Sequence, residues 1–166
     1  MSLKGTFIPA ILALSIIMAC ASPGPKTLDP DDVHWATYTD STLQYSLEYP
    51  DVYTIKKEGD DVVFQYEGRT AMQVVFVDEE TGRRRGLWFS NEPSGEIQLG
   101  TIEGQRYVYD HYHGLFYSRT ITYAVPYKNK YIGLEFRKNK GESLLDEVEL
   151  KILASFKFTA PELLPE

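Results

Sequence analysis

Three side chains in one stretch of alternating residues have the chemistry to bind a metal ion or a small ligand. Tyr109, His111 and His113 are spaced two apart, and side chains at this spacing point to the same face of a β-strand. Imidazole nitrogens bind many divalent metals. No further histidine and no cysteine lies nearby in the sequence. We therefore favour the simpler interpretation, in which both histidines face solvent beside a turn, and we predict no metal site.

No other combination of residues is typical of a catalytic site. The sequence lacks the elbow motif of a serine hydrolase and the glycine-rich loop that holds phosphate groups. The neighbouring carboxylates Glu79 and Glu80 belong to a charged run that water is expected to solvate. We therefore predict no catalytic residue, no cofactor and no enzymatic activity.

Cys20 is the residue whose position indicates a covalent modification. It ends the motif Ile17-Met18-Ala19-Cys20, which closes an apolar run preceded by the positive charge of Lys4. This arrangement resembles a bacterial lipoprotein signal, in which the peptidase cuts before the cysteine and leaves it as a lipidated N-terminus. The apolar run has the length of a signal peptide and is too short for a typical spanning helix.

An ordinary signal peptide is the alternative, because Ala19-Cys20-Ala21 also fits the small-x-small pattern of signal peptidase. Cys20 is the only cysteine in the chain, and its place next to the cut favours lipidation. Acyl chains contribute about 0.8 kcal/mol per buried methylene and hold a protein on a membrane without a spanning helix. We expect the protein on the periplasmic or extracytoplasmic face. Ala21 and Ser22 lack the aspartate that retains some lipoproteins at the inner membrane, which favours the outer membrane where the host has one.

The chain divides into four predicted segments. Residues 1–19 are the signal peptide, and residues 20–33 are the lipidated cysteine with a tether rich in proline, glycine and aspartate. Residues 34–160 form one β-rich domain and residues 161–166 a tail. The net charge of −7 argues against binding to nucleic acid and against electrostatic adhesion to anionic lipids. The acyl chains, rather than charge, are expected to hold the protein on the membrane.

Alternating apolar residues predict antiparallel strands along the domain. Residues 70–77 are apolar on both faces, so this strand should lie in the interior of the sheet. Residues 105–112, 115–125 and 130–137 predict a three-stranded meander with tight turns between the strands. Its core face should pair Ile121, Tyr123 and Val125 with Ile132, Leu134 and Phe136.

A helix and a short strand are predicted to close the domain. Ser143 can cap the helix, and Asp146 and Glu147 lie near its positive end. Phe156 and Phe158 then form the closing strand. The predicted fold class is therefore α+β, with a curved antiparallel sheet of about seven to eight strands and a C-terminal helix packed on it.

One charged segment interrupts the predicted strands. Residues 78–85 read DEETGRRR, and their mixed charges around a Thr-Gly pair are typical of a solvated hairpin tip. A basic contact loop for an acidic partner is the functional alternative, which we favour less. Residues 86–90 and 96–102 are predicted to be strands.

Several of these features together resemble the PsbP-like proteins. The shared features are YSLEYP at 45–50, Ile102 and Gly104 before an alternating strand, a late strand at 131–136, and a helix running into ILASFKF. This family shares its fold with a Ran-binding nuclear import factor and includes bacterial lipoproteins. Relatives commonly have a helix before the Ile-x-Gly strand, where this sequence predicts only loops and strands. The resemblance implies an antiparallel sheet that serves as a docking or assembly module.

These observations predict a lipid-anchored, non-enzymatic envelope protein that docks on or helps to assemble a membrane complex. A sheet face bearing tyrosines from the hairpin at 104–123 is the predicted contact surface for an envelope protein partner, because tyrosine combines apolar area with a polar tip. A lipoprotein that binds a small ligand or a metal ion is the alternative function.

Overall fold

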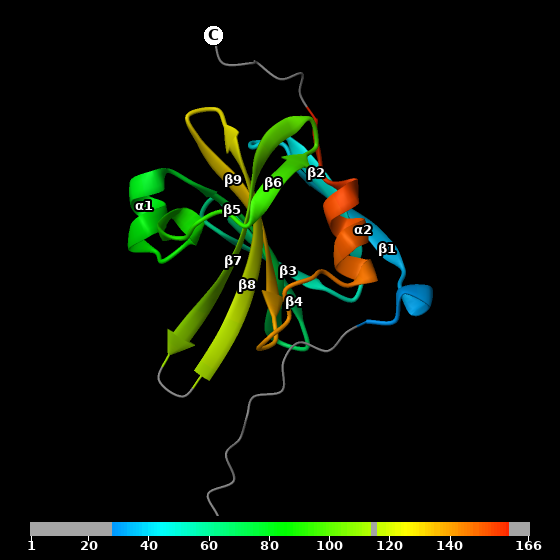
Figure 1. Ribbon diagram of the computed structural model, residues 1–166. Coiled ribbons are helices and arrows are strands. Elements are labelled where there is room, and N and C mark those ends of the chain that lie inside the picture. Colours follow the sequence, from blue (N-terminus) through cyan, green and yellow to red (C-terminus); the bar gives the residue numbers. More distant parts are fainter. Residues whose placement is uncertain (1–27, 114–115, 160–166) are drawn as a thin grey trace, which may run out of the picture.

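The structure is a computed structural model that describes residues 28–159 except 114–115, with the backbone alone at residues 112, 113 and 116. Figure 1 shows two antiparallel sheets, with a helix packed beside them near the C-terminus. The predicted signal peptide, Cys20 and the tail at 161–166 lie outside the described residues, as does most of the predicted tether.

Seven strands form the larger sheet in the order β3-β4-β5-β9-β8-β7-β6. All neighbouring pairs are antiparallel. As predicted, the strand that is apolar on both faces, β5, lies in the interior of the sheet. The strands are β3 (Thr54–Glu58), β4 (Asp61–Tyr66), β5 (Arg69–Val77), β6 (Gly95–Leu99), β7 (Ile102–His113), β8 (Phe116–Tyr127) and β9 (Lys130–Lys138).

The smaller sheet has the order β1-β2-β10. It is formed by β1 (Trp35–Asp40), β2 (Tyr45–Pro50) and β10 (Lys157–Phe158), and α2 (Glu147–Ser155) packs against β2. The predicted fold class is confirmed: the protein is α+β, and its larger sheet is open. Strand β1 was not predicted from the sequence, whereas the closing strand, β10, was.

One hydrophobic core joins the two sheets and α2. It contains Tyr45 and Leu47 from the smaller sheet, Phe64 from the larger sheet, and Val148 and Ile152 from the helix. The register of β8 against β9 pairs Ile121 with Phe136, Tyr123 with Leu134 and Val125 with Ile132. This is the predicted core-facing register.

A second, smaller cluster covers part of the opposite face of the larger sheet. Trp88, in the short 3-10 helix η2 (Trp88–Ser90), is almost fully buried there. Its indole lies on Gly133 of β9, where an added Cβ would come within 2.5 Å of Trp88 Cη2. The absence of a side chain at Gly133 therefore lets the indole reach the sheet.

The predicted hairpin tip at 78–85 is wrong, because this segment contains helix α1 (Glu79–Arg84). The Asp78 side chain accepts the Thr81 N–H at 2.8 Å as an N-cap, and Arg83 pairs with Glu79 one turn earlier. Local capping and an i,i+4 ion pair thus favour a helical turn. The strand predicted at 86–90 is also wrong, since η2 lies there. The interval expected to hold only loops and strands therefore contains α1.

The predicted cap of the C-terminal helix is wrong by three residues. Asp146, rather than Ser143, is the N-cap of α2, and it forms a reciprocal capping box with Glu149. Near the N-terminus of the described chain, the short 3-10 helix η1 (Pro30–Asp32) lies within the predicted tether. Leu28 and Val33 pack against the core, so this part of the tether segment belongs to the folded domain.

Candidate functional site

Tyr109, one of the residues selected from the sequence, is buried on the outer face of the larger sheet. Its side chain is 6% exposed, and its hydroxyl donates to Glu135 Oε1 at 2.8 Å. Burial raises the pKa of the Tyr109 hydroxyl, and the charge of Glu135 raises it further, because both disfavour a phenolate. Tyr109 is therefore a hydrogen-bond donor inside the fold.

Glu135 is a buried carboxyl group that the sequence analysis missed. It is 0% exposed in β9 and accepts hydrogen bonds from Tyr109 and from the Gln73 side chain on β5. The Thr122 hydroxyl lies 3.4 Å from the same carboxyl group. Such donors offset the cost of removing a carboxylate from water. The alternation of β9 places Glu135 opposite the core, and nothing in that pattern indicates that the opposite face is also covered.

Of the two histidines that were considered as metal ligands with Tyr109, only His111 has a described side chain. The His111 ring is half-buried and packs edge-on against Tyr109, with the ring centroids 4.9 Å apart. His113 ends β7, and only its backbone is described. Within residues 28–159, as far as they are described, no group of three or more His, Cys, Asp or Glu side chains is placed to hold a metal ion.

Three of the described tyrosines of the β7–β8 hairpin pack within the fold. Tyr107 is half-buried, and its ring centroid lies 6.5 Å from that of Trp88. Tyr123 is half-buried and contacts Phe136 edge-on at 6.3 Å. With Tyr109 buried as well, these three side chains do not contribute to an exposed tyrosine face. Tyr117, near the tip of the hairpin, is half-buried under Lys140, whose Nζ lies 5.4 Å from its ring centroid.

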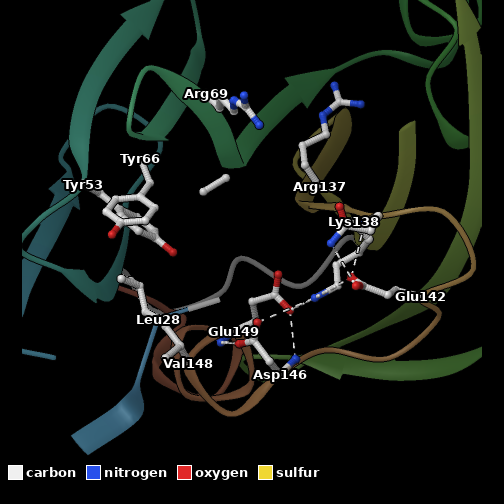
Figure 2. Close-up of a pocket in the computed structure, with 12 residues that line it drawn as sticks. Leu28, Tyr53, Tyr66, Arg69, Arg137, Lys138, Glu142, Asp146, Val148 and Glu149 are labelled. Atoms are coloured by element: carbon white, nitrogen blue, oxygen red, sulfur yellow. Dashed lines mark hydrogen bonds and ion pairs between the residues drawn. The ribbon is translucent and has the colours of Figure 1, made fainter. Parts of the chain in front are cut away.

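A hollow lies where β5 and β9 separate at one end of the larger sheet. The register between these strands ends at the pair Met72 and Phe136. Beyond this pair Figure 2 shows a small hollow, with a cavity volume of about 30 Å³. Leu28, the β4–β5 hairpin, the end of β9 and the first turn of α2 line it.

Lys138 forms an ion-pair cluster on one wall of this hollow. Its Nζ lies 2.5 Å from Glu149 Oε2, 3.7 Å from Asp146 Oδ2 and 3.8 Å from Glu142 Oε2. Lys138 is 7% exposed and Glu149 is also buried. Burial raises the pKa of the Glu149 carboxyl, and the Lys138 ammonium opposes this rise without cancelling it. The cluster joins the end of β9 to the start of α2.

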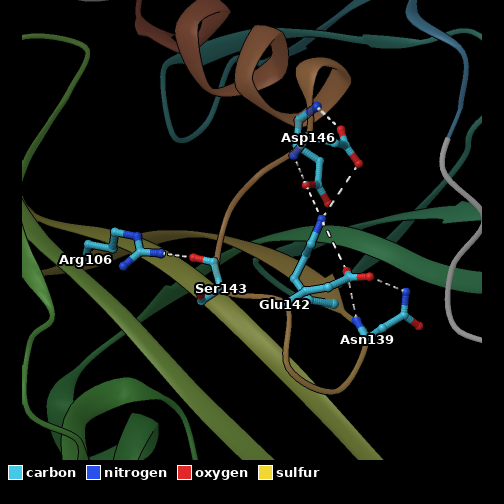
Figure 3. A network of polar contacts seen from close by, with 7 residues as sticks. Arg106, Asn139, Glu142, Ser143 and Asp146 are labelled. Carbon is cyan, nitrogen blue, oxygen red and sulfur yellow. Dashed lines mark hydrogen bonds and ion pairs between the residues drawn. The ribbon is translucent and has the colours of Figure 1, made fainter.

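The loop between β9 and α2 is fixed by a second set of polar contacts, which Figure 3 shows. The Arg106 guanidinium on β7 donates to the Ser143 carbonyl and, at 2.9 Å, to Ser94 Oγ. Asn139 Nδ2 donates to Glu142 Oε1 at 2.9 Å. These contacts hold the loop against the sheet.

Arg69 and Arg137 lie on the side of the hollow away from α2, as Figure 2 shows. Arg137 Nη1 donates to Thr120 Oγ1 at 2.8 Å. The rings of Tyr53 and Tyr66 lie beside the hollow with centroids 5.9 Å apart. Burial raises the pKa of the Tyr53 hydroxyl, and the negative charges of Glu149 and Asp146 add to the rise.

The lining thus places two guanidinium groups across the hollow from an acidic cluster. Guanidinium groups and tyrosine hydroxyls can bind a polar ligand by hydrogen bonds. The acidic cluster is held by contacts among its own members, Lys138, Asp146 and Glu149. These contacts fix α2 on the sheet. The arrangement fits a small polar ligand better than a chemical reaction that needs a free nucleophile.

No known protein family and no curated protein matches this sequence. Among solved structures, the crystal structure of a protein from Bacteroides thetaiotaomicron VPI-5482 is similar, with a TM-score of 0.51 and 13% sequence identity. The similarity covers 74% of this chain and 47% of that chain. The chain thus spans about half the length of this structural neighbour, and the likeness concerns the fold alone.

Proposed function

We propose that this protein is a lipid-anchored protein of the cell envelope that acts as a docking or assembly module and not as an enzyme. The observation that carries the proposal is Cys20, the only cysteine, directly after Ile17-Met18-Ala19 and an apolar run of signal-peptide length. Acyl chains on this cysteine would hold the folded domain at the extracytoplasmic face of a membrane. Among the described residues, no helix has the length and apolar character needed to cross a membrane.

An exposed apolar side chain on α2 supports docking on a protein partner. Leu150 on this helix is 50% exposed. Apolar side chains of this kind supply area that a protein partner can remove from water. The proposal therefore combines a membrane anchor with a protein-binding domain.

Substitution of Cys20 tests the anchor. We expect the wild-type chain to incorporate an alkyne-labelled fatty acid and to sediment with membranes. Cys20→Ala should lose both properties, because no thiol remains to be acylated. Ser22→Ala, two residues later, is the matched control and should keep both. Fatty-acid labelling that persists in Cys20→Ala would contradict the proposal.

In-cell crosslinking followed by mass spectrometry tests docking. A defined envelope protein should be crosslinked to the anchored wild type, and its recovery should fall in Leu150→Asp, which places a charge on the apolar contact area. Lys151→Asp is the control on the neighbouring exposed position. Recovery of the anchored wild type without any partner would contradict the docking function.

The hollow favours a second candidate function, binding of a small polar ligand by the same anchored protein. A ligand screen by nuclear magnetic resonance should then find compounds whose binding is lost in Arg69→Ala and kept in Arg83→Ala, an exposed arginine on α1. Stoichiometric metal in the purified protein that is lost in His111→Ala would instead indicate a metal-binding protein.

A further inference from the structure

The chain between the proposed anchor and the folded domain is short. Residues 21–27 separate Cys20 from Leu28. Whatever conformation they adopt, eight residue steps span at most about 26–29 Å at roughly 3.3–3.6 Å per step. Leu28 can therefore lie no farther than this from a lipidated Cys20.

Leu28 lies at one end of the domain, which we call the near pole. It packs against the core and lines the same hollow as Lys138 and Asn139 at the end of β9. In Figure 1 this end of the larger sheet lies in the lower part of the picture, as do the first described residues, in blue. The near pole thus comprises Leu28, the last residues of β9 and the loop at 139–146.

The opposite end of the domain, the far pole, is formed by the β8–β9 turn at Lys128 and Asn129 with the residues around it. The Tyr127 ring stacks on Phe158 with centroids 4.5 Å apart. The Thr159 N–H donates to the Gln44 carbonyl at 2.7 Å. The turn before β2, the turn after β8 and the strand β10 therefore meet at this pole.

Strand β9 connects the two poles and gives their separation. It runs from Lys130 at the far pole to Lys138 at the near pole, a distance of about 26–27 Å at roughly 3.3–3.4 Å per residue. The maximum reach of residues 21–27 is almost the same. A bilayer contact through the far pole would need this segment to be nearly fully extended, whereas contact through the near pole is open to every shorter conformation.

We infer that the near pole faces the bilayer and that the far pole, around Lys128, Asn129 and Phe158, is turned away from it. This inference rests on the proposed lipid anchor. It gives the near pole one partner, the lipid surface.

The side chains at the near pole are compatible with lipid head groups without selecting them by charge. Lys140 is exposed, and its Nζ lies 5.4 Å above the Tyr117 ring; lysine and tyrosine are common at membrane interfaces. Glu142, Asp146 and Glu149 surround the single positive charge of Lys138, so this cluster offers no excess of cations to anionic head groups. The length of the anchor segment, rather than net charge, sets the orientation.

Fluorescence quenching tests this orientation on the processed, lipidated chain. The Cys20 sulfur is blocked by its lipid, so a thiol-reactive dye labels only an introduced cysteine. Lys140→Cys marks the near pole and Asn129→Cys the far pole, both at exposed positions flanking β9. The vesicles contain phosphatidylethanolamine, phosphatidylglycerol and a lipid with a nitroxide on its head group. We expect at least threefold stronger quenching at position 140 than at position 129. Equal quenching, or stronger quenching at position 129, would overturn the inference.

A chain with a longer anchor segment shows whether the orientation depends on the length of this segment or on the affinity of the near pole for the bilayer. Insertion of about ten glycine and serine residues after Pro25 gives a reach well beyond the length of β9, so the quenching ratio should fall toward one. An unchanged ratio would overturn the argument from length. An intact mass without acyl chains identifies failure of the proposed anchor itself, whereas an acylated protein with equal quenching identifies failure of the orientation alone.

Discussion

Hydrogen bonds to buried polar groups connect strands that are distant in the sequence. Glu135 on β9 receives its donors from β5 and β7, and Asp40 at the end of β1 accepts from Lys57 on β3. Each of these carboxyl groups is buried, so each would be costly without its donors. At the scale of single residues, these groups hold the strands together. Substituting a donor or an acceptor measures how much each hydrogen bond contributes to the free energy of unfolding.

Tyr109→Phe removes one of the donors to Glu135. We expect the free energy of unfolding to fall by about 1–3 kcal/mol, because the buried carboxyl loses a hydrogen-bond partner. Urea denaturation followed by circular dichroism measures the change. Tyr107→Phe, at the half-buried position two residues earlier, is the control and should change stability less. A loss no larger than that of the control would show that this hydrogen bond contributes little.

Asp40→Asn tests the pH dependence of stability. Burial by itself raises the pKa of the Asp40 carboxyl, but the Leu43 N–H and the Lys57 ammonium outweigh it and lower the pKa. A carboxyl whose pKa is lowered by folding stabilises the fold above its unfolded pKa of about 3.9, and this contribution is lost as the pH falls through the folded pKa. Asp40→Asn should therefore cost about 1–3 kcal/mol at pH 7, and the difference from wild type should shrink below about pH 4.

The measurement is urea denaturation of both proteins at pH 7 and near pH 3. Asp51→Asn, at an exposed position, should change stability little at either pH. A difference between Asp40→Asn and wild type that stays constant down to pH 3 would contradict the assigned role of the charge.

At the scale of elements, the first residue of α2 separates prediction from structure: Ser143 was the predicted N-cap, and Asp146 is the N-cap in the structure. Asp146 accepts the Glu149 N–H at 2.9 Å, and Glu149 accepts the Asp146 N–H at 2.9 Å. Loss of an N-cap costs about 0.5–2 kcal/mol. Asp146→Ala should therefore lower thermal stability, whereas Ser143→Ala should have little effect, because Arg106 contacts only the backbone carbonyl of Ser143. The opposite order of effects would restore Ser143 as the cap.

Alternation predicted the strands because these strands bury one face in the core. The register of β8 against β9 follows from apolar residues at every second position, and the interior place of β5 follows from apolar residues on both faces. Segment 78–85 was wrong because a Thr-Gly pair between charges fits a turn as well as a helix. The N-cap at Asp78 and the pair of Glu79 with Arg83 are local signals of a helix, whereas the passage of the chain to β6 rather than to β9 is not local to the segment.

The candidate site was less predictable than the fold. Tyr109 and His111 were selected for their spacing, but the hydrogen-bond partner of Tyr109 is Glu135, which comes from another strand. The hollow arises where β5 and β9 separate and where Leu28 returns to the sheet, and neither event leaves a local pattern. Contacts between elements distant in the sequence therefore carried the information that spacing lacked.

At the scale of the whole molecule, stability depends on contacts between its layers. The core cluster includes residues from both sheets and α2, and the ion pair between Lys138 and Glu149 joins the larger sheet to the helix. A buried ion pair is costly to break, because the remaining charge stays buried without its partner. This pair is therefore a test of how strongly α2 is held on the sheet.

Lys138→Met should lower the free energy of unfolding by about 3–5 kcal/mol, because Glu149 would remain buried beside Asp146 without a cation. Adding Glu149→Gln should restore part of this loss, since the neutral amide keeps an oxygen for the Asp146 N–H and removes the uncompensated charge. Urea denaturation of the single and double variants measures this coupling. Lys56→Met removes an exposed ion pair with Glu58 and should cost less than about 1 kcal/mol. If Lys138→Met costs no more than Lys56→Met, the layers are held by the apolar core alone.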